Sequence, residues 1–245
     1  MNLISEFHRK MTKYQPDFDI AGLLARDGRI YSFGTDTKVL STIFEMTVRP
    51  FILEIAQDNN LLVFEPVQQN FYPDFTLMSG KEDTSKIAID VKSTYRDFRV
   101  DNSWRASFTL GGYTSFLRNE TKNIAFPYSQ YEKHYIIGFI YSRMTLQKEA
   151  KTYTIEDLSE IPCPFYDVEY FVQEKYLISG EHPGSGNTTN IGSIRGSSIE
   201  EFAEGKGPFA KHEESVFEDY WRNYGKSANE RPYSNLAEYW QWKEN

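Results

Sequence analysis

Several features that would define other classes of protein are scarce or missing in this sequence. Its 245 residues include one cysteine, Cys163, so no disulfide can form within the chain and a reducing compartment is expected. No apolar run approaches the length that spans a bilayer, and residues 1–20 lack a signal-peptide pattern. We therefore expect a soluble, cytoplasmic protein with no membrane partner. Zinc is not expected, because metal-ligand spacing is missing from the four histidines, His8, His134, His182 and His212.

An excess of positive charge is missing as well. The 27 lysines and arginines are outnumbered by 35 aspartates and glutamates, and the net charge is −8. This balance argues against a protein that coats nucleic acid non-specifically. It is compatible with DNA binding at one cleft, if basic side chains line that cleft and a bound metal neutralises carboxylates there. The length suits one domain of ordinary size with a sizeable core.

The stretch from 65 to 92 carries the strongest chemical pattern. A Pro-Asp pair ends at Asp74, and after a gap the chain continues with Asp90-x-Lys92. The segment KIAIDVK alternates with period two, which predicts a strand with Asp90 and Lys92 on one face. If PDFTLMSG forms a hairpin with this strand, Asp74 lies beside Asp90. Two close carboxylates repel each other unless a cation lies between them, and their oxygens suit Mg²⁺. Together with Lys92 they would form a centre able to cleave phosphodiesters.

Other elements follow from periodicity and end signals. A helix is predicted from about Thr37 to Asp58, with Asp36 as its N-cap. Taken alone, Glu45 on this helix is more typical of a solvated glutamate than of a ligand. A short helix within 2–14, a hairpin over 18–33, strands at 61–65 and 134–143, and one long strand or a strand pair over 168–179 are also expected. Aromatic residues at helical spacing in the C-terminal third are expected to serve packing.

The spacing of Asp74, Asp90 and Lys92 resembles the signature of the PD-(D/E)xK nuclease superfamily. Alone this is a weak signal, because both short strings are common. Over nearly the whole chain, the sequence also resembles the EcoRV family of type II restriction endonucleases, and the likeness fades near the termini and between Arg96 and Ser107. Four segments carry it in the same order: DTKVLSTIFE (36–45), QQNFYPDFTL (68–77), FTLGGYTSF (108–116) and GSGNTTNIGSI (184–194).

The resemblance implies a fold and an activity. The fold would be a restriction-endonuclease-like α/β (α+β) domain over residues 1–245, with a mixed central sheet flanked by helices. A small dimerisation subdomain would comprise about 19–33 and 151–164, and the remainder would bind and cut DNA. The activity would be Mg²⁺-dependent hydrolysis of double-stranded DNA at GATATC, leaving blunt ends, by a homodimer of the prokaryotic cytoplasm. A cognate methyltransferase is expected in the same system, although not as a stable partner.

The resemblance also assigns roles to individual residues. Catalysis is assigned to Asp74, Asp90, Lys92 and Glu45. Metal binding is assigned to Asp74, Asp90, Glu45 and the backbone carbonyl of Val91. Base recognition is assigned to Gly184, Gly186, Asn187, Thr188, Gln69 and Asn70. Contacts to the DNA backbone are assigned to Thr37, Lys38, Gln68, Thr94, Thr109, Ser115, Lys122, Arg143 and Arg222. The sequence departs from the family pattern at Glu120, where a carboxylate replaces an asparagine and would repel phosphate.

The chemistry of the residues is compatible with these assignments, but alternatives remain open. An asparagine can bond the N6/N7 edge of adenine, and a threonine methyl can touch thymine. The central TA step of GATATC is cheap to kink, so deformation would add specificity. Without the resemblance, segment 184–194 is typical of a flexible connector or an anion-binding nest, and 68–70 of a polar loop. Two other functions are a junction resolvase or repair nuclease of the same superfamily, and a catalytically silent DNA-binding module.

Overall fold

A five-stranded mixed sheet forms the centre of the molecule. The computed structural model describes residues 1–68, 70–144, 152–184, 189–225 and 228–245. The strand order is β11-β9-β5-β4-β3, with β5 and β9 parallel and the other pairs antiparallel. The strands are β3 (Leu62–Phe64), β4 (Phe75–Met78), β5 (Lys86–Tyr95), β9 (Tyr131–Arg143) and β11 (Phe165–Glu174). The predicted mixed sheet is confirmed, with β9, which contains the predicted strand at 134–143, in its interior.

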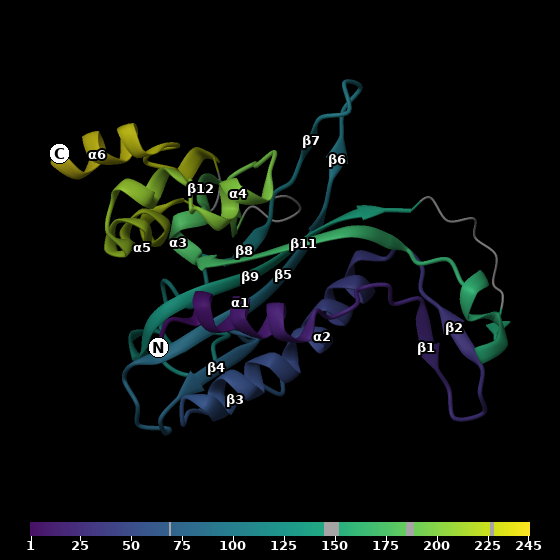
Figure 1. Ribbon diagram of the computed structural model, residues 1–245. Coiled ribbons are helices and arrows are strands. Elements are labelled where there is room, and N and C mark those ends of the chain that lie inside the picture. Colours follow the sequence, from purple (N-terminus) through teal and green to yellow (C-terminus); the bar gives the residue numbers. More distant parts are fainter. Residues whose placement is uncertain (69, 145–151, 185–188, 226–227) are drawn as a thin grey trace.

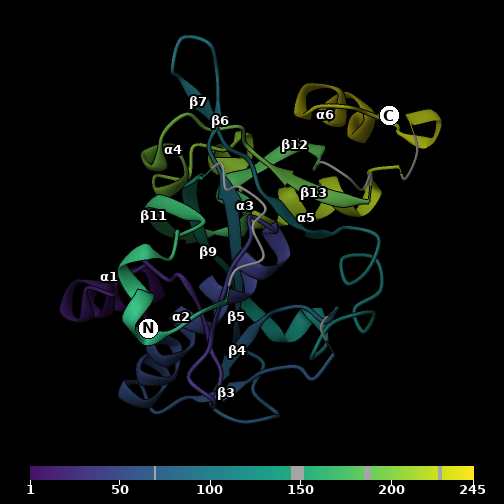
Figure 2. The same cartoon turned by 90° about the vertical axis from the view of Figure 1, so that its right-hand side faces the viewer.

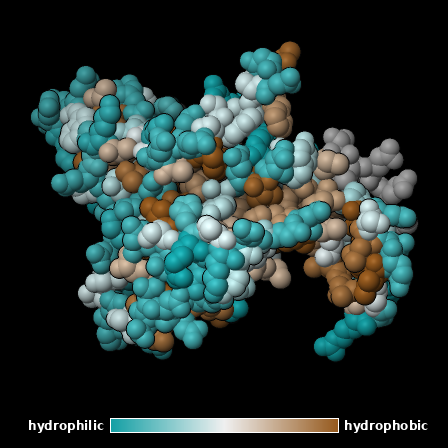
Figure 3. Space-filling view, viewed as in Figure 1, coloured by the Kyte–Doolittle hydropathy of each residue, from teal (hydrophilic) through white to brown (hydrophobic). Residues whose placement is uncertain are grey.

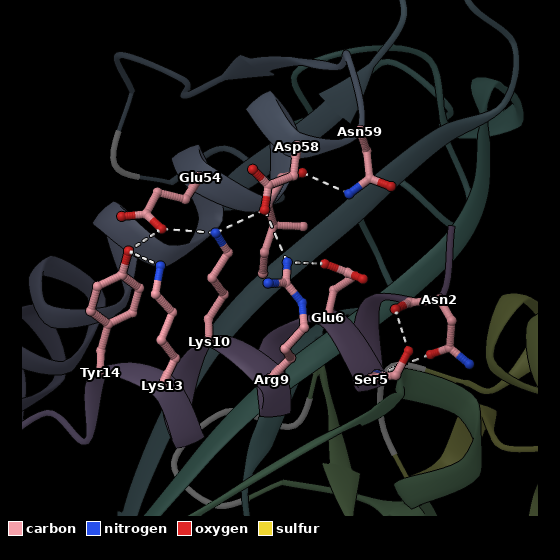
Figure 4. A network of polar contacts seen from close by, with 11 residues as sticks. Asn2, Ser5, Glu6, Arg9, Lys10, Lys13, Tyr14, Glu54, Asp58 and Asn59 are labelled. Atoms are coloured by element: carbon pink, nitrogen blue, oxygen red, sulfur yellow. Dashed lines mark hydrogen bonds and ion pairs between the residues drawn. The ribbon is translucent and has the colours of Figure 1, made fainter.

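Two helices cover one face of this sheet, as Figure 1 shows: α1 (Leu3–Tyr14) and α2 (Thr37–Asp58). The predicted helix and N-cap are confirmed, since Asp36 accepts a hydrogen bond from the backbone N–H of Lys38 at 2.8 Å. Apolar side chains of both helices meet those of β5 and β9 in one core. Lys10 of α1 joins the helices through ion pairs to Glu54 and Asp58 of α2 (Figure 4).

A second layer covers the opposite face. It contains a three-stranded sheet in the order β12-β13-β8, formed by β8 (Thr109–Gly112), β12 (Ser179–Pro183) and β13 (Asn190–Ser193). Beside it lie α4 (Ile199–Ala203), α5 (Glu214–Asn223) and α6 (Leu236–Glu244), as both views show (Figures 1 and 2). The aromatic residues of this C-terminal third are packing residues, as predicted, and the fully buried ones include Phe217, Tyr220, Trp221 and Tyr239.

Two hairpins project from the body (Figure 1). The first confirms the predicted hairpin: β1 (Gly22–Leu24) pairs with β2 (Ile30–Ser32), and β10 (Thr152–Tyr153) adds a third strand. The second is formed by β6 (Asp97–Phe98) and β7 (Trp104–Arg105). The short 3-10 helices are η1 (Tyr128–Gln130), η2 (Ile155–Glu160), η3 (Pro208–Lys211) and η4 (Ala228–Glu230). Within the described segments, no helix is long and apolar enough to cross a membrane.

One long strand or a strand pair was expected over 168–179, and this expectation was wrong at Lys175–Ile178. Strand β11 ends at Glu174, a single helical turn α3 (Lys175–Ile178) follows, and β12 then begins. Lys175 and Ile178 are both buried, and their spacing of three residues is that of one helical turn rather than of a strand. The turn carries the chain from the central sheet into the second layer and buries a lysine between them.

Candidate active site

The hairpin of β4 and β5 brings the two predicted aspartates together. The strands pair antiparallel with Phe75 opposite Ile89. Asp74 directly precedes β4 and therefore comes level with Asp90 on β5. The backbone N–H of Val91 donates a hydrogen bond of 2.7 Å to Oδ2 of Asp74, which fixes this carboxylate against the neighbouring strand.

Three oxygen atoms of this hairpin surround the ammonium of Lys92. Its Nζ lies 2.7 Å from Oδ2 of Asp90, 3.3 Å from the carbonyl oxygen of Val91 and 3.9 Å from Oδ2 of Asp74. Only 5% of the Asp90 side chain is exposed, so water does little to offset its charge. Two carboxylates and a carbonyl that converge on one cation form the type of oxygen set that binds a hard divalent ion.

The pKa values show how unbalanced the charges are. Burial raises the pKa of Asp74 to about 7, although Lys92 opposes the shift, and the neighbouring carboxylate of Asp90 raises it further. Burial alone would lower the pKa of Lys92, but the charges of Asp90 and Asp74 outweigh it and raise that pKa. Lys92 is therefore charged at neutral pH, whereas Asp74 exchanges its proton in that range. An added cation would relieve the repulsion between the two acids.

A cavity of about 370 Å³ opens beside these three side chains. Its other walls come from the segment before β4, from β8 and the turn after it, and from the start of β13; they include Asn70, Gly112, Ser115, Lys122, Thr189 and Asn190. Gly111 on this wall has a φ of +93°, a conformation that favours glycine. The cavity therefore joins the acidic hairpin to the second layer of the molecule.

The segment assigned to base recognition reaches this cavity wall at Thr189 and Asn190. Asn190 of β13 lies opposite Gly112 of β8, and its carbonyl accepts a 2.9 Å hydrogen bond from the N–H of Gly184. The two ends of the loop between β12 and β13 are thus held together beside β8. Four of the predicted base-contacting residues lie outside the described residues: Gln69, Gly186, Asn187 and Thr188.

Glu45 lies on α2, and its carboxyl is coupled to the acidic hairpin. Burial raises its pKa, Lys92 lowers it, and Asp90 raises it again. Across the described ranges of the chain, however, no group of three or more histidine, cysteine, aspartate or glutamate side chains is arranged to hold a metal ion. The geometry thus groups Asp74 with Asp90 but does not add Glu45 as a third acidic ligand.

The residues assigned to the DNA backbone fall into two sets. The first set borders the active site. Ser115 and Lys122 line the cavity, and Thr94 lies on β5 two residues beyond Lys92. Thr109 lies beside the recognition segment, since its Oγ1 is 3.0 Å from the Cβ position built on Gly184.

The second set lies on other parts of the described surface. Thr37 and Lys38 are exposed in the first turn of α2, and Gln68 is exposed before β4. Arg143 lies over the ring of Tyr95, 4.4 Å from its centroid.

Two positions of this surface are already engaged within the chain. The Nε of Arg222 donates a 3.0 Å hydrogen bond to the carbonyl of Leu117. Glu120, the departure from the family pattern, accepts a hydrogen bond of 3.0 Å from Ser129.

Sequence reasoning missed the polar residues behind the hairpin. Lys175 is 2% exposed, and its Nζ lies 4.2 Å from the ring centroid of Tyr72, which is two residues before Asp74. The hydroxyl of Tyr72 is 2.8 Å from Nδ1 of His134, one of the four histidines without metal-ligand spacing. Burial keeps the pKa of His134 well below its usual value, so this ring is neutral. The available signal was a lysine between two apolar stretches, 170–172 and 176–178, of the segment expected to form strands.

Two aspartates and a lysine on the central hairpin of a mixed sheet are the arrangement expected of a PD-(D/E)xK nuclease. The family described as Restriction endonuclease EcoRV matches residues 14–244, and the chain belongs to this family. It is 47% identical over 245 residues to the type II restriction enzyme EcoRV of Escherichia coli, with 99% of this chain and 98% of that protein covered. Among solved structures, the NlaIV restriction endonuclease has a TM-score of 0.41 and 10% identity, covering 89% of this chain and 85% of that one.

Family membership decides between the functions that the sequence left open. A match over almost the full length of both chains favours a restriction endonuclease over a junction resolvase or a repair nuclease. Asp74, Asp90 and Lys92 are all retained and lie together, which is not expected of a catalytically silent DNA-binding module.

Proposed function

We propose that this protein is a homodimeric, Mg²⁺-dependent type II restriction endonuclease that cuts double-stranded DNA at GATATC and leaves blunt ends. The observation that carries the proposal is the convergence of two carboxylates and a backbone carbonyl on Lys92 Nζ, in a cavity that Thr189 and Asn190 also line. One site thus combines groups for hydrolysis with a segment able to read bases.

The residues of the hairpin have separate roles in this proposal. Asp74, Asp90 and the carbonyl of Val91 hold the metal ion. When bound, Mg²⁺ makes water a better nucleophile at neutral pH and offsets negative charge on the reacting phosphate. Lys92 orients the attacking water and stabilises the negative charge that grows on the phosphate oxygens. Glu45 is proposed to act from the neighbouring helix as an additional acidic group near the metal.

DNA recognition is proposed for the loop between β12 and β13. Its glycines let the backbone approach the bases closely, and its asparagine and threonine supply an adenine contact and a thymine contact. Gln69 and Asn70 would approach the DNA just before Asp74, so that binding of the duplex and placement of a metal ligand are coupled. The first set of backbone residues would hold phosphates: Ser115 and Lys122 from the cavity wall, and Thr94 and Thr109 from positions beside it.

Dimerisation is proposed for the projecting sheet of β1, β2 and β10, which lies in the dimerisation subdomain that the family resemblance implies, about 19–33 and 151–164. Leu23 and Leu24 are 58% and 64% exposed, and Ile155 and Leu158 of the adjoining η2 are each 55% exposed. Figure 3 shows hydrophobic residues gathered on this hairpin, at the right of the view. An exposed apolar patch of this kind is typical of a protein–protein contact. A twofold dimer would place one active site on each strand of a palindromic sequence.

Cleavage mapping tests the proposal most directly. Plasmid DNA carrying one GATATC site is incubated with the protein and Mg²⁺, and the ends of the products are sequenced. Cutting between the central T and A on both strands is expected, and Asp90→Ala should remove it. Uncut plasmid, or equal cutting by Asp90→Ala, would refute the catalytic assignment.

Binding assays in Ca²⁺ test recognition separately from cleavage. A GATATC duplex should bind more tightly than a duplex with a scrambled site, and Asn187→Ala should reduce that difference by about 1–3 kcal/mol. Equal affinities of the wild type for the two duplexes would leave the recognition site unsupported, whatever the outcome of cleavage mapping.

The dimer contact has its own matched pair of variants. Leu24→Asp adds a charge to the proposed interface and should yield a monomer by analytical ultracentrifugation. Val100→Asp adds the same charge to a fully exposed position in the other hairpin, between β6 and β7, and should leave the dimer intact. Retention of the dimer by Leu24→Asp would place the interface elsewhere.

A further inference from the structure

The lysine buried behind the active site has an unusual environment. Only 2% of Lys175 is exposed, and within the described residues the contacts of its ammonium are with aromatic faces rather than with carboxylates. Its closest partners are aromatic faces, the ring of Tyr72 at 4.2 Å and that of Phe116 at 4.9 Å. Such contacts are weaker than an ion pair. A buried ammonium without a carboxylate is costly, so packing alone does not explain a lysine here.

Lys175 is nevertheless part of the active-site region. Tyr72, Phe116 and Gly111 all line the cavity that contains Asp74, Asp90 and Lys92. The Cβ position built on Gly111 is 3.7 Å from Nζ of Lys175, so the ammonium lies just behind this wall. Burial lowers the pKa of Lys175 to about 8, while the charge of Asp90 raises it. The lysine therefore keeps most of its charge at neutral pH and interacts electrostatically with Asp90.

Tyr72 connects this lysine to the metal ligands. Its ring stacks on Phe116 with centroids 4.4 Å apart, and its hydroxyl is 2.8 Å from Nδ1 of the buried His134. Tyr72 is followed by Pro73 and then Asp74. The contacts that fix the ring of Tyr72 therefore also help to fix the carboxylate of Asp74, two residues later. The Lys175 ammonium over the ring adds an electrostatic contact to that support.

Building on the proposed metal-dependent cleavage, we propose that Lys175 is a positioning residue that acts on Asp90 through its charge and on Asp74 through Tyr72. Its positive charge adds to the field that stabilises growing negative charge at the reacting phosphate. The same charge repels a divalent cation. Lys175 thus weakens metal binding while it speeds the chemical step, and its unpaired burial lowers the stability of the fold.

Lys175→Met keeps the length of the side chain and removes its charge. Three effects follow: higher thermal stability, tighter metal binding and slower cleavage. In EDTA the melting temperature should rise, because a buried unpaired charge is replaced by an apolar group. The Ca²⁺ concentration that gives half of the thermal stabilisation should fall by about tenfold at low salt, because the repulsion is lost. The single-turnover rate at saturating Mg²⁺ should fall by about tenfold or more. Lys175→Arg restores the charge and should bring the half-stabilising Ca²⁺ concentration back toward the wild-type value.

Lys10→Met is the matched control. Lys10 is also buried, at 3% exposed, but its ammonium is paired with Glu54 at 2.8 Å and with Asp58 at 2.9 Å. Its removal takes one ion-pair partner from each of these two carboxylates, which keep Tyr14 and Arg9 respectively, so the melting temperature should fall while the Ca²⁺ dependence stays that of the wild type. The two substitutions, Lys175→Met and Lys10→Met, should therefore shift the melting temperature in opposite directions in the same assay.

The outcomes separate this inference from the proposed function. If Lys175→Met lowers the melting temperature or fails to fold, or leaves the Ca²⁺ dependence unchanged, Lys175 is a structural residue and the inference is overturned. The melting and Ca²⁺ measurements need no cleavage, so they remain decisive even if the wild type cuts no DNA. Absence of cleavage by the wild type would instead refute the proposed function.

Discussion

Replacing Asp74 by asparagine should make the metal-free protein more stable at pH 8, although it should abolish cleavage. The carboxyl of Asp74 has a pKa of about 7 in the folded chain, against an ordinary value of 3.8, chiefly because of burial. A carboxyl with a raised pKa contributes stability below its unfolded pKa, and that contribution is lost as the pH rises through the folded value. The penalty therefore develops between about pH 4 and pH 7 and is complete at pH 8. Asparagine has the shape of the neutral acid and never incurs it.

The magnitude follows from the shift in pKa. The folded and ordinary pKa values differ by about 3 units, and each unit corresponds to about 1.4 kcal/mol. The upper limit on the gain in free energy of unfolding is therefore about 4 kcal/mol. A quarter of the Asp74 side chain remains exposed, and Val91 N–H still finds an acceptor in asparagine, so about 2 kcal/mol is a reasonable expectation. For a chain of this length, that free energy corresponds to a rise of about 4–8 °C in melting temperature.

Thermal melting in EDTA from pH 4 to pH 9 measures the effect. The curves of Asp74→Asn and wild type should nearly coincide at pH 4 and separate as the pH rises. Asp83→Asn is the control, because hydrogen bonds from Ser79 and Ser85 lower the pKa of that carboxyl and the variant should lose stability at pH 8. A lower melting temperature for Asp74→Asn at pH 8 would refute the argument that the uncompensated carboxylate strains the metal-free site.

Three further predictions concern the support of this site. Asp36→Ala should lower the free energy of unfolding by about 1 kcal/mol in urea denaturation, because α2 loses its N-cap, and an unchanged midpoint would contradict the cap. Gly138→Ala should lower the free energy of unfolding by about 1–3 kcal/mol, because the added methyl on β9 would meet the ring of Phe171 on β11. A stability equal to wild type would show that the ring can move aside. Glu45→Gln should keep the cleavage rate within about tenfold of wild type, because Glu45 completes no ligand cluster in the described chain. The rate of Asp90→Ala should be far lower. If the two variants lose equal rates in single-turnover assays, Glu45 is an essential ligand.

The acidic hairpin could be predicted from the sequence because local rules determine it. Period two puts Asp90 and Lys92 on the same face of one strand, and a short connection makes the preceding strand its antiparallel neighbour. The resulting register, with Phe75 opposite Ile89, leaves little freedom for the placement of Asp74. The helix from 37 to 58 was equally accessible, because an N-cap and an apolar stripe mark it.

The residues behind the hairpin could not be predicted in the same way. Lys175 reaches the active site because one helical turn interrupts a segment that was expected to form strands, and this turn places its ammonium over the ring of Tyr72. The neighbours of Lys175 come from positions 72, 111 and 116, far away in the sequence. A short-range sequence pattern therefore cannot predict these contacts. Burial of the lysine depends on tertiary packing, which periodicity does not encode.

The two perturbed groups near the active site have the same physical origin. Burial raises the pKa of Asp74 to about 7 and lowers that of Lys175 to about 8, so an acid and a base are both displaced toward neutrality within one region. A direct ion pair between them would relax both shifts, but Asp74 faces Lys92, and Lys175 faces aromatic rings. Substitutions that remove either charge should therefore stabilise the metal-free protein, and each should slow the cleavage of DNA. Stability and activity should move in opposite directions at these two positions, whereas at Lys10, where the buried charge is paired, the loss of charge should lower stability.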